Sequence, residues 1–292
     1  MKDALRPVAA CALISTALAA CGGRTESRSD TTTGSVPNGA SGSSTGGVPT
    51  GYISFTECSG GMCSQQPQFA LDAAFAPAGF APSQSVVLAT SDACAVYDAY
   101  GASTGSSGST SPPIVSAGTL TLSGGTMGTG VPVTPGDGPA NPEFYAYDGD
   151  SILLHAGETL TVSASGATVP AFGPASIVAP ALPVLVAPVA VSGFYRIPTS
   201  ADLVVEWTGG EAGGTFSFFA QGADGTQYLE CEWPASLGQG TIPRAMLAPF
   251  AGTSNDGATV GYAQQVATSF TAGEYTISMT AQQYGTGQLM FE

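Results

Sequence analysis

Apolar and polar residues alternate with a period of two in short segments along the chain from residue 51 onward. In GTLTLSG, Leu120 and Leu122 fall on one side, and the threonines and serine between them fall on the other. Such alternation is typical of β-strands that bury one face, so it predicts an all-β fold. The same pattern in ETLTVSA, DLVVEW, GTFSFFAQ and EYTISM predicts these further inward residues: Leu160, Val162, Ala164, Leu203, Val205, Trp207, Phe216, Phe218, Ala220, Tyr275, Ile277 and Met279.

Glycine-rich turn signals separate these segments. They include SGG, DGD, GGEAGG, ADG and the NDG at Asn255–Gly257, and no segment shows a sustained helical period. Short strands at regular spacing with such turns favour a sandwich of antiparallel strands. We expect about twelve to sixteen strands in it.

The first twenty residues have the layout of an export signal. Lys2 and Arg6 precede a run at residues 7–20 that is almost wholly apolar. This run is too short for a transmembrane helix, which needs about 20 apolar residues, but it suits the core of a signal peptide. The order Leu-Ala-Ala-Cys at residues 18–21 then resembles the lipobox of bacterial lipoprotein precursors.

The lipobox resemblance implies that residues 1–20 are a removable signal peptide and that Cys21 becomes the lipidated N-terminus. In such lipoproteins the cysteine sulfur is diacylated and the new amino group is acylated. Gly22, rather than an aspartate, follows the cysteine, and by the usual sorting rule this implies the outer membrane, with the protein facing either side of it. The alternative is an ordinary secretory signal with an incidental cysteine.

Residues 21–50 resemble a tether between this anchor and the folded part. After the lipobox cysteine, 29 residues rich in Ser, Thr and Gly contain no aromatic residue, and valine is the only larger aliphatic one. They cannot bury enough apolar surface to offset the entropy of ordering, so we expect them to be disordered. A coil of this length spans roughly 30 Å.

The charge of the chain excludes some partners. Removal of residues 1–20 would leave 20 acidic and 4 basic residues and a formal charge near −16. Such a surface repels nucleic acid and anionic membrane surfaces. We therefore predict no nucleic-acid partner, and contact with a membrane only through the lipid on Cys21.

Prolines at residues 169–191 mark a boundary within the β-rich region. Because proline removes backbone donors, this apolar segment is expected to be neither a central strand nor a helix. We expect it to run along a seam between two packed sandwich-like halves, residues 51–180 and 181–292, although one large sandwich is also possible. Residues 101–113, rich in serine and glycine, are expected to form a long exposed loop.

Four cysteines besides the lipobox cysteine predict two disulfides in an exported chain. Four cysteines permit three pairings. We favour Cys58 with Cys63 across a short turn, and Cys94 with Cys231, whose position in YLECEW directs it toward the core. A zinc site is the alternative, but the spacing lacks a second matched pair or a nearby histidine. We expect no metal and no cofactor.

The sequence offers no convincing catalytic triad. The only histidine, His155, lies at the end of a predicted strand and is expected at the surface. Ser44 and Ser103 are the central serines of GxSxG strings at residues 42–46 and 101–105. A nucleophile elbow needs a strand before the serine and a helix after it, and neither string has that setting. We therefore expect that the protein is not a serine hydrolase.

Two pairs of carboxylates are weaker candidates. Glu230 and Glu232 share one face of a predicted strand at a spacing that could serve glycoside chemistry, but a solvated acidic face is the favoured interpretation. Asp148 and Asp150 in YDGDS could bind calcium, although a tight acidic turn is the favoured interpretation here too.

Three function classes remain open. A non-enzymatic binding or structural module of the cell envelope, with an unknown protein or glycan ligand, is favoured by the anchor, the tether and the missing catalytic set. A carbohydrate-binding module would need an exposed aromatic platform, and Trp207 and Trp233 are predicted to face inward. An enzyme that uses carboxylates or a metal is third. The tyrosines that could form a platform are Tyr97, Tyr100, Tyr145 and Tyr147.

The β-rich region also loosely resembles a group of uncharacterised secreted lipoproteins of myxobacteria. The strings AGTLTLSGG, GETLTVSASGATVPAF and LECEWPASLGQGTIPRAML support the resemblance. It covers about two thirds of the mature chain, and it implies a β-sandwich but no activity.

Overall fold

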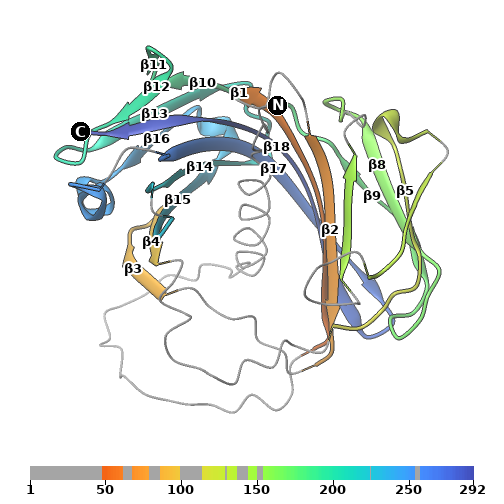
Figure 1. The fold of residues 1–292 in the computed structure, drawn as a ribbon. Helices are drawn as coiled ribbons and strands as arrows, with labels where there is room; N and C mark the ends of the chain where they lie inside the picture. Colours follow the sequence, from red (N-terminus) through yellow and green to blue (C-terminus); the bar gives the residue numbers. More distant parts are fainter. Residues whose placement is uncertain are drawn as a thin grey trace, which may run out of the picture.

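A computed structural model describes residues 48–61, 68–78, 86–98, 114–128, 130–136, 144–149, 154–223, 225–253 and 257–292. Most of these residues lie in β-strands, which form three sheets (Figure 1). The predicted all-β fold with packed antiparallel sheets is confirmed. The described part contains eighteen strands, more than expected, because three short strands lie within the proline-rich segment.

Eleven strands form one large sheet. Nine of them follow one another in this order: β3 (Val86–Thr90), β4 (Cys94–Asp98), β15 (Gln227–Pro234), β14 (Thr215–Gln221), β17 (Thr259–Ala272), β18 (Tyr275–Phe291), β1 (Thr50–Gly61), β2 (Gln68–Ala76) and β7 (Tyr145–Gly149). β12 (Phe194–Ile197) pairs with the end of β18, and β11 (Ala190–Val191) pairs with β12. Figure 1 shows that this sheet is bent into an arch.

The two smaller sheets lie against the outer, convex side of the arch (Figure 1). The four-stranded sheet has the order β6 (Val131–Val133), β5 (Leu120–Ser123), β8 (Thr159–Ala164) and β9 (Phe172–Val178). The three-stranded sheet has the order β10 (Val184–Ala187), β13 (Leu203–Thr208) and β16 (Gln239–Ile242). The helical turns are short: η2 (Gly125–Met127), η3 (Ala235–Leu237), α2 (Arg244–Leu247) and η4 (Ala248–Phe250).

The large sheet contains strands from both ends of the β-rich region. β1 pairs in parallel with β18 and antiparallel with β2, and β4 pairs with β15. β12 also runs parallel to β18, and the other ladders of the described chain are antiparallel. Residues 51–180 and 181–292 therefore both contribute to one continuous sheet.

Two hydrophobic cores fill the space between the large sheet and the smaller ones. The first core lies against the four-stranded sheet and includes Phe55, Phe75 and Leu160. The second core lies against the three-stranded sheet, where Trp207 stacks on Phe216 with ring centroids 3.9 Å apart. Every inward residue predicted from the alternation is buried, so that prediction is confirmed.

The proline-rich segment connects the two smaller sheets. Its strands are β9 and β10, each at the edge of its sheet, and β11, which pairs only with β12. The prediction that this segment is not a central strand is confirmed. Between β9 and β10, residues 179–183 pass from the first core, where Ala179 is buried, to the second core, against which Leu182 packs.

Helices of the described residues are too short and too polar to cross a membrane.

Candidate functional site

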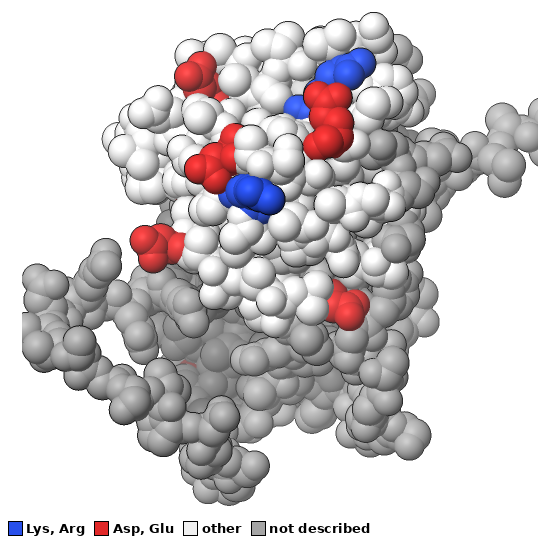
Figure 2. Space-filling model, turned by 90° about the vertical axis from the view of Figure 1, so that its left-hand side faces the viewer, with Lys and Arg blue, Asp and Glu red and all other residues white. Residues whose placement is uncertain are grey.

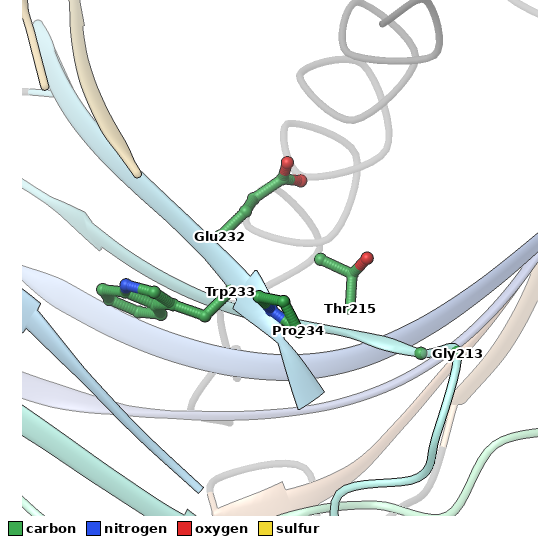
Figure 3. Close-up of a pocket in the computed structure, with 6 residues that line it drawn as sticks. Gly213, Thr215, Glu232, Trp233 and Pro234 are labelled. Atoms are coloured by element: carbon green, nitrogen blue, oxygen red, sulfur yellow. The ribbon is translucent and has the colours of Figure 1, made fainter. Parts of the chain in front are cut away.

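The concave face of the large sheet differs in composition from the convex face. Along β15, Leu229, Cys231 and Trp233 enter the second core, whereas Tyr228, Glu230 and Glu232 lie on the opposite side. Figure 3 shows Glu232 on one side of the strand and Trp233 on the other. The period of two thus places a set of polar and aromatic groups on the side that the smaller sheets do not cover.

Three aromatic rings form a row across neighbouring strands of the concave face. Tyr97 on β4 lies directly opposite Tyr228 on β15, with ring centroids 6.4 Å apart and planes inclined by 35°. Tyr228 and Phe219 on β14 have centroids 6.2 Å apart and planes inclined by 26°. Phe219 and Tyr228 are therefore stacked with an offset, and Tyr97 is tilted relative to Tyr228. We call Tyr97, Tyr228 and Phe219 the aromatic row.

The ring of Phe219 lies flat on the backbone of β17. Gly261 is the register partner of Phe219, and a Cβ atom built on it would approach the ring to 1.9 Å. Only glycine leaves this space, so Gly261 allows the ring to lie down on the sheet. In this position Phe219 is buried in a small apolar cluster with Cys58, Ala263 and Tyr284, against which Tyr228 packs.

Two carboxylates follow the aromatic row along β15. Glu230 is buried and Glu232 is exposed, so the expected solvated face is correct for Glu232 and wrong for Glu230. Glu232 is in contact with solvent but lies in a hollow among protein atoms, and this burial raises the pKa of its carboxyl above the ordinary value. Desolvation disfavours the charged form, so Glu232 takes up a proton more readily than a free glutamate.

A shallow hollow of about 390 Å³ lies at the far end of β14 and β15. Gly213, Gly214 and Thr215 line it together with residues 232–234. Thr215 and Glu232 point to the same side in Figure 3. Ser217, the register partner of Glu232, is 1 % exposed, and its Oγ has no hydrogen-bond partner in the described part of the chain.

A second polar group lies on the convex face, between the two cores. Glu57, Gln283 and Gln264 occupy matching positions on β1, β18 and β17, and all three are buried. Leu154 donates its backbone N–H to Glu57 Oε2, and Gln283 Nε2 donates to the Leu154 carbonyl at 2.9 Å. We call Glu57, Gln283 and Gln264 the seam row, and it holds the chain before β8 against the large sheet.

Burial shifts the ionisation of Glu57, the one acidic residue of the seam row. It raises the pKa of Glu57, against opposing effects of the Leu154 amide and of His155. Neither amide atom of Gln264 has a hydrogen-bond partner among the described residues, although the side chain is fully buried. The seam row therefore contains buried polar groups of which only some have hydrogen-bond partners among the described residues.

The predicted Cys94–Cys231 disulfide is present. It links register partners on β4 and β15 with a Cα–Cα distance of 4.0 Å, and both sulfurs enter the second core. Cys58 also takes part in a disulfide. Cys63 lies outside the described residues, so its pairing with Cys58 stays a prediction.

The structure separates the other predicted site residues. His155 is exposed in the connection between β7 and β8, and Asp148 is exposed at the end of β7. No group of three or more His, Cys, Asp or Glu residues in the described part could hold a metal ion. These candidates lie outside the described residues: Cys21, Ser44, Ser103, Asp150, Asn255 and Tyr100.

Of the described aromatic candidates, only Tyr97 reaches the concave face. Trp207 and Trp233 are buried in the second core, as predicted. Tyr145 is fully buried in the first core, where its hydroxyl accepts from the Ala117 N–H at 2.8 Å and donates to the Gly118 carbonyl at 2.7 Å. Tyr147 packs against the same core.

Sequence reasoning missed Tyr228, Phe219 and the seam row. Phe219 interrupts the alternation of GTFSFFAQ, and this is a signal that both sides of β14 carry large residues. Ala-Gln-Gln occurs at residues 263–265 and again at 281–283, and the two copies meet in antiparallel register on β17 and β18. This repeat could have indicated a pair of neighbouring strands.

The acidic character of the chain extends to its surface. Two basic residues are present in the described part: Arg196, which forms an ion pair with Glu292 at 2.9 Å, and Arg244 on α2. On the face shown in Figure 2, the basic side chains lie next to acidic ones and form no continuous positive patch.

The chain matches no known protein family, and no curated protein matches it. The resemblance to lipoproteins therefore stays a prediction, and the function must be argued from the site.

Proposed function

We propose that this protein is a lipid-anchored, non-enzymatic binding module of the cell envelope, and that the concave face of its large sheet carries the binding site. The single observation that supports a binding role is that the half-buried Tyr97 and Tyr228 and the exposed Glu232 with its hollow share the side of the sheet that faces away from both cores. Flat rings next to polar groups are typical of recognition surfaces.

A non-enzymatic role agrees with the arrangement of the described residues. The exposed His155 lies in the β7–β8 connection, whereas Glu230 and Glu232 lie on β15. General acid–base catalysis needs two groups held within reach of one reacting atom and tuned to opposite protonation states. Glu232 has a raised pKa, but Glu230, the other carboxylate on this face of β15, is buried.

The anchor is tested by the variant Cys21→Ser. The lipid-anchored chain is expected in the membrane fraction, whereas the variant is expected in the soluble fraction or as an uncleaved precursor, because the serine hydroxyl cannot replace the acylated thiol. A Cys21→Ser chain of mature length that remains with the outer membrane would contradict the anchor.

Binding is tested with the soluble Cys21→Ser chain and washed cell-envelope fragments. Saturable sedimentation with the fragments is expected, and it should be lost in a Tyr97→Leu/Tyr228→Leu double variant. Tyr147→Leu is the matched control, because Tyr147 lies on the same sheet but packs against the first core. Equal sedimentation of all three chains would remove the concave face as the binding site.

A further inference from the structure

Four exposed valines lie within eight consecutive residues of the proline-rich segment. Exposed apolar residues are normally scattered singly over a protein surface. Here Val184, Val186, Val189 and Val191 are four of the ten large apolar side chains that are exposed among the described residues, with exposed fractions of 61 %, 43 %, 68 % and 50 %. We call these four residues the valine patch.

The valine patch lies on two consecutive strands at one rim of the molecule. Val184 and Val186 are on β10, and Val191 is on β11, which forms a hairpin with β12. Figure 1 shows β10, β11 and β12 together at the top left of the view. Val189 follows Val186 by three residues, so their Cα atoms are at most about 11 Å apart. The four valines therefore belong to one region of the surface.

This region has little negative charge, although the chain as a whole is acidic. The sequence has 21 acidic residues, yet none of them occurs at residues 159–201. Arg196 is the one charged residue in this range, and it is paired with Glu292. Glu206, the register partner of Ala187, lies beside the patch. A membrane surface, which the acidic chain would otherwise repel, meets few carboxylates here.

The backbone around the patch offers little to an added protein strand. β11 has two residues, and β10 has four and is bounded by Pro183 and Pro188. Strand addition depends on main-chain hydrogen bonds, and proline cannot donate one. A partner therefore contacts valine side chains, which form no hydrogen bonds, whereas specific protein interfaces carry about one hydrogen bond per 100–200 Å². Such a surface suits a fluid apolar phase better than a protein of defined shape.

The hairpin continues from the valines toward more polar residues. The exposed Val191 is followed by a small turn at residues 192–193, by the half-buried rings of Phe194 and Tyr195, and then by the exposed Arg196. Tyrosine rings favour the headgroup level of a membrane, and arginine extends its charge into the water beyond it. The order of these residues is therefore typical of a segment that enters a membrane interface.

The predicted tether is long enough to let the patch reach the membrane of the lipid anchor. Residues 21–48 span at most about 90 Å when extended. Thr50 pairs with Thr276 at the start of β18, close to the end of this segment. Phe194 pairs with Gln288, which is twelve residues further along β18, or at most about 40 Å. A tethered contact also acts at a high effective concentration, so it can be weak by itself.

We propose that the valine patch rests on a lipid surface without net charge and inserts its side chains among the headgroups. This contact goes beyond the proposed function and uses neither Tyr97, Tyr228 nor Glu232. It adds a second contact to the lipid on Cys21, through which alone the sequence predicts membrane contact. Without that lipid it is reversible, so washing still releases the Cys21→Ser chain from membranes.

The test is sedimentation of the soluble Cys21→Ser chain with lipid vesicles. Phosphatidylcholine vesicles have no net charge, and phosphatidylglycerol vesicles are anionic. The bound fraction is expected to rise with the phosphatidylcholine concentration and to persist in 1 M NaCl, where the Debye length is only about 3 Å. No binding at millimolar phosphatidylcholine, or binding that 1 M NaCl abolishes, would overturn the inference.

Paired variants identify the surface that binds. Val189→Thr/Val191→Thr keeps the β-branched shape but adds two hydroxyls, and it should weaken vesicle binding by at least about tenfold. Val87→Thr/Leu88→Thr is the matched control, because it changes two exposed apolar residues on β3. This control should bind like the parent chain. Equal binding by all three chains would exclude the valine patch.

A tryptophan in the patch reports insertion directly. Trp207 and Trp233 are buried in the second core, so a third tryptophan at an exposed position is the one that responds to lipid. Val191→Trp should bind phosphatidylcholine vesicles more tightly, and its emission should shift to shorter wavelength when they are added. An unchanged emission from the vesicle-bound variant would place the lipid contact elsewhere and contradict the inference.

The remaining outcomes separate this inference from its alternatives. If analytical ultracentrifugation finds a dimer that Val189→Thr/Val191→Thr dissociates, the patch is an interface between two copies and the inference is wrong. If Cys21→Ser stays with the membrane until the two threonines release it, the lipid anchor is wrong and the valine patch stands. Tyr97→Leu/Tyr228→Leu should bind vesicles normally, so failure of the concave site leaves this inference intact.

Discussion

The two faces of the large sheet use the same strands in different ways. On β14, Phe216 and Phe218 are fully buried beneath the three-stranded sheet, whereas Ser217 and Phe219 lie on the concave face. The convex side is apolar except for the seam row, is covered by two smaller sheets and is cross-linked by a disulfide. The concave side combines rings, carboxylates and unpaired polar atoms. The concave side also has a small buried cluster of Cys58, Phe219, Ala263 and Tyr284, so the two sides differ in the share of polar groups that they bury.

The largest loss of unfolding free energy is expected from removal of the Cys94–Cys231 disulfide. Cys94 and Cys231 are 137 residues apart in the chain, and in the chain-entropy model a loop of this size stabilises the fold by about 5 kcal/mol. The double variant Cys94→Ala/Cys231→Ala should lose most of this in urea unfolding. A loss below about 1 kcal/mol would mean that the second core holds β4 and β15 together without the disulfide.

The next largest effect is expected at Phe216. This ring is fully buried and stacks on Trp207, so Phe216→Ala removes packing from both residues. The expected loss is about 4 kcal/mol of unfolding free energy, which urea denaturation measures. A loss below about 1 kcal/mol would show that the convex face is not the stabilising one.

A smaller, pH-dependent effect is expected at Glu57. Its folded-state pKa is raised, mainly by burial, so the native protein keeps this proton to a higher pH than the unfolded chain does. The contribution of Glu57 is therefore fully present below the ordinary pKa of a glutamate and is lost as the pH rises through the raised pKa. Glu57→Gln should flatten this part of the stability profile.

The measurement for Glu57 is urea unfolding across the pH range, for the wild type and for Glu57→Gln. The difference between the two should grow in favour of the variant as the pH increases. Glu232→Gln provides a comparison on the concave face: its pKa is raised in the same direction, but its side chain is exposed. Parallel stability curves for the wild type and Glu57→Gln would show that Glu57 does not titrate differently in the folded state.

The smallest effect on the free energy of unfolding is expected at Ser217, where the substitution should stabilise the protein rather than destabilise it. Ser217 Oγ is buried without a partner, and an unpaired buried hydroxyl costs free energy. Ser217→Ala should therefore stabilise the protein by up to about 1 kcal/mol. Thermal unfolding measures this change. A destabilised variant would show that the hydroxyl has a structural role.

Much of the convex face could be predicted from the sequence, because alternation directly reports which side of a strand is buried. Leu203, Val205 and Trp207 follow it without exception. Cys231 was placed correctly for the same reason, whereas its pairing with Cys94 was only the favoured one of the three pairings that four cysteines permit. The concave site could not be predicted in this way, because Tyr97 and Tyr228 come from distant parts of the chain and meet only through the pairing of β4 with β15.

The seam row was missed for a related reason. A polar residue within a strand is normally assigned to solvent, and Glu57, Gln264 and Gln283 all break that rule. They are buried because the two cores meet there and the backbone of Leu154 supplies hydrogen-bond partners from the β7–β8 connection. Such a site depends on tertiary contacts that no local pattern contains.

The parallel pairing of β1 with β18 also constrains how the chain matures. The first described strand lies between β2 and the last strand. A nascent chain that stops short of residue 275 would expose one edge of β1 and one edge of β17, with no partner for either. Contacts this far apart in sequence close slowly. The final seventeen-residue strand therefore decides when the arch closes, and a growing chain cannot adopt this fold before synthesis of that strand is finished.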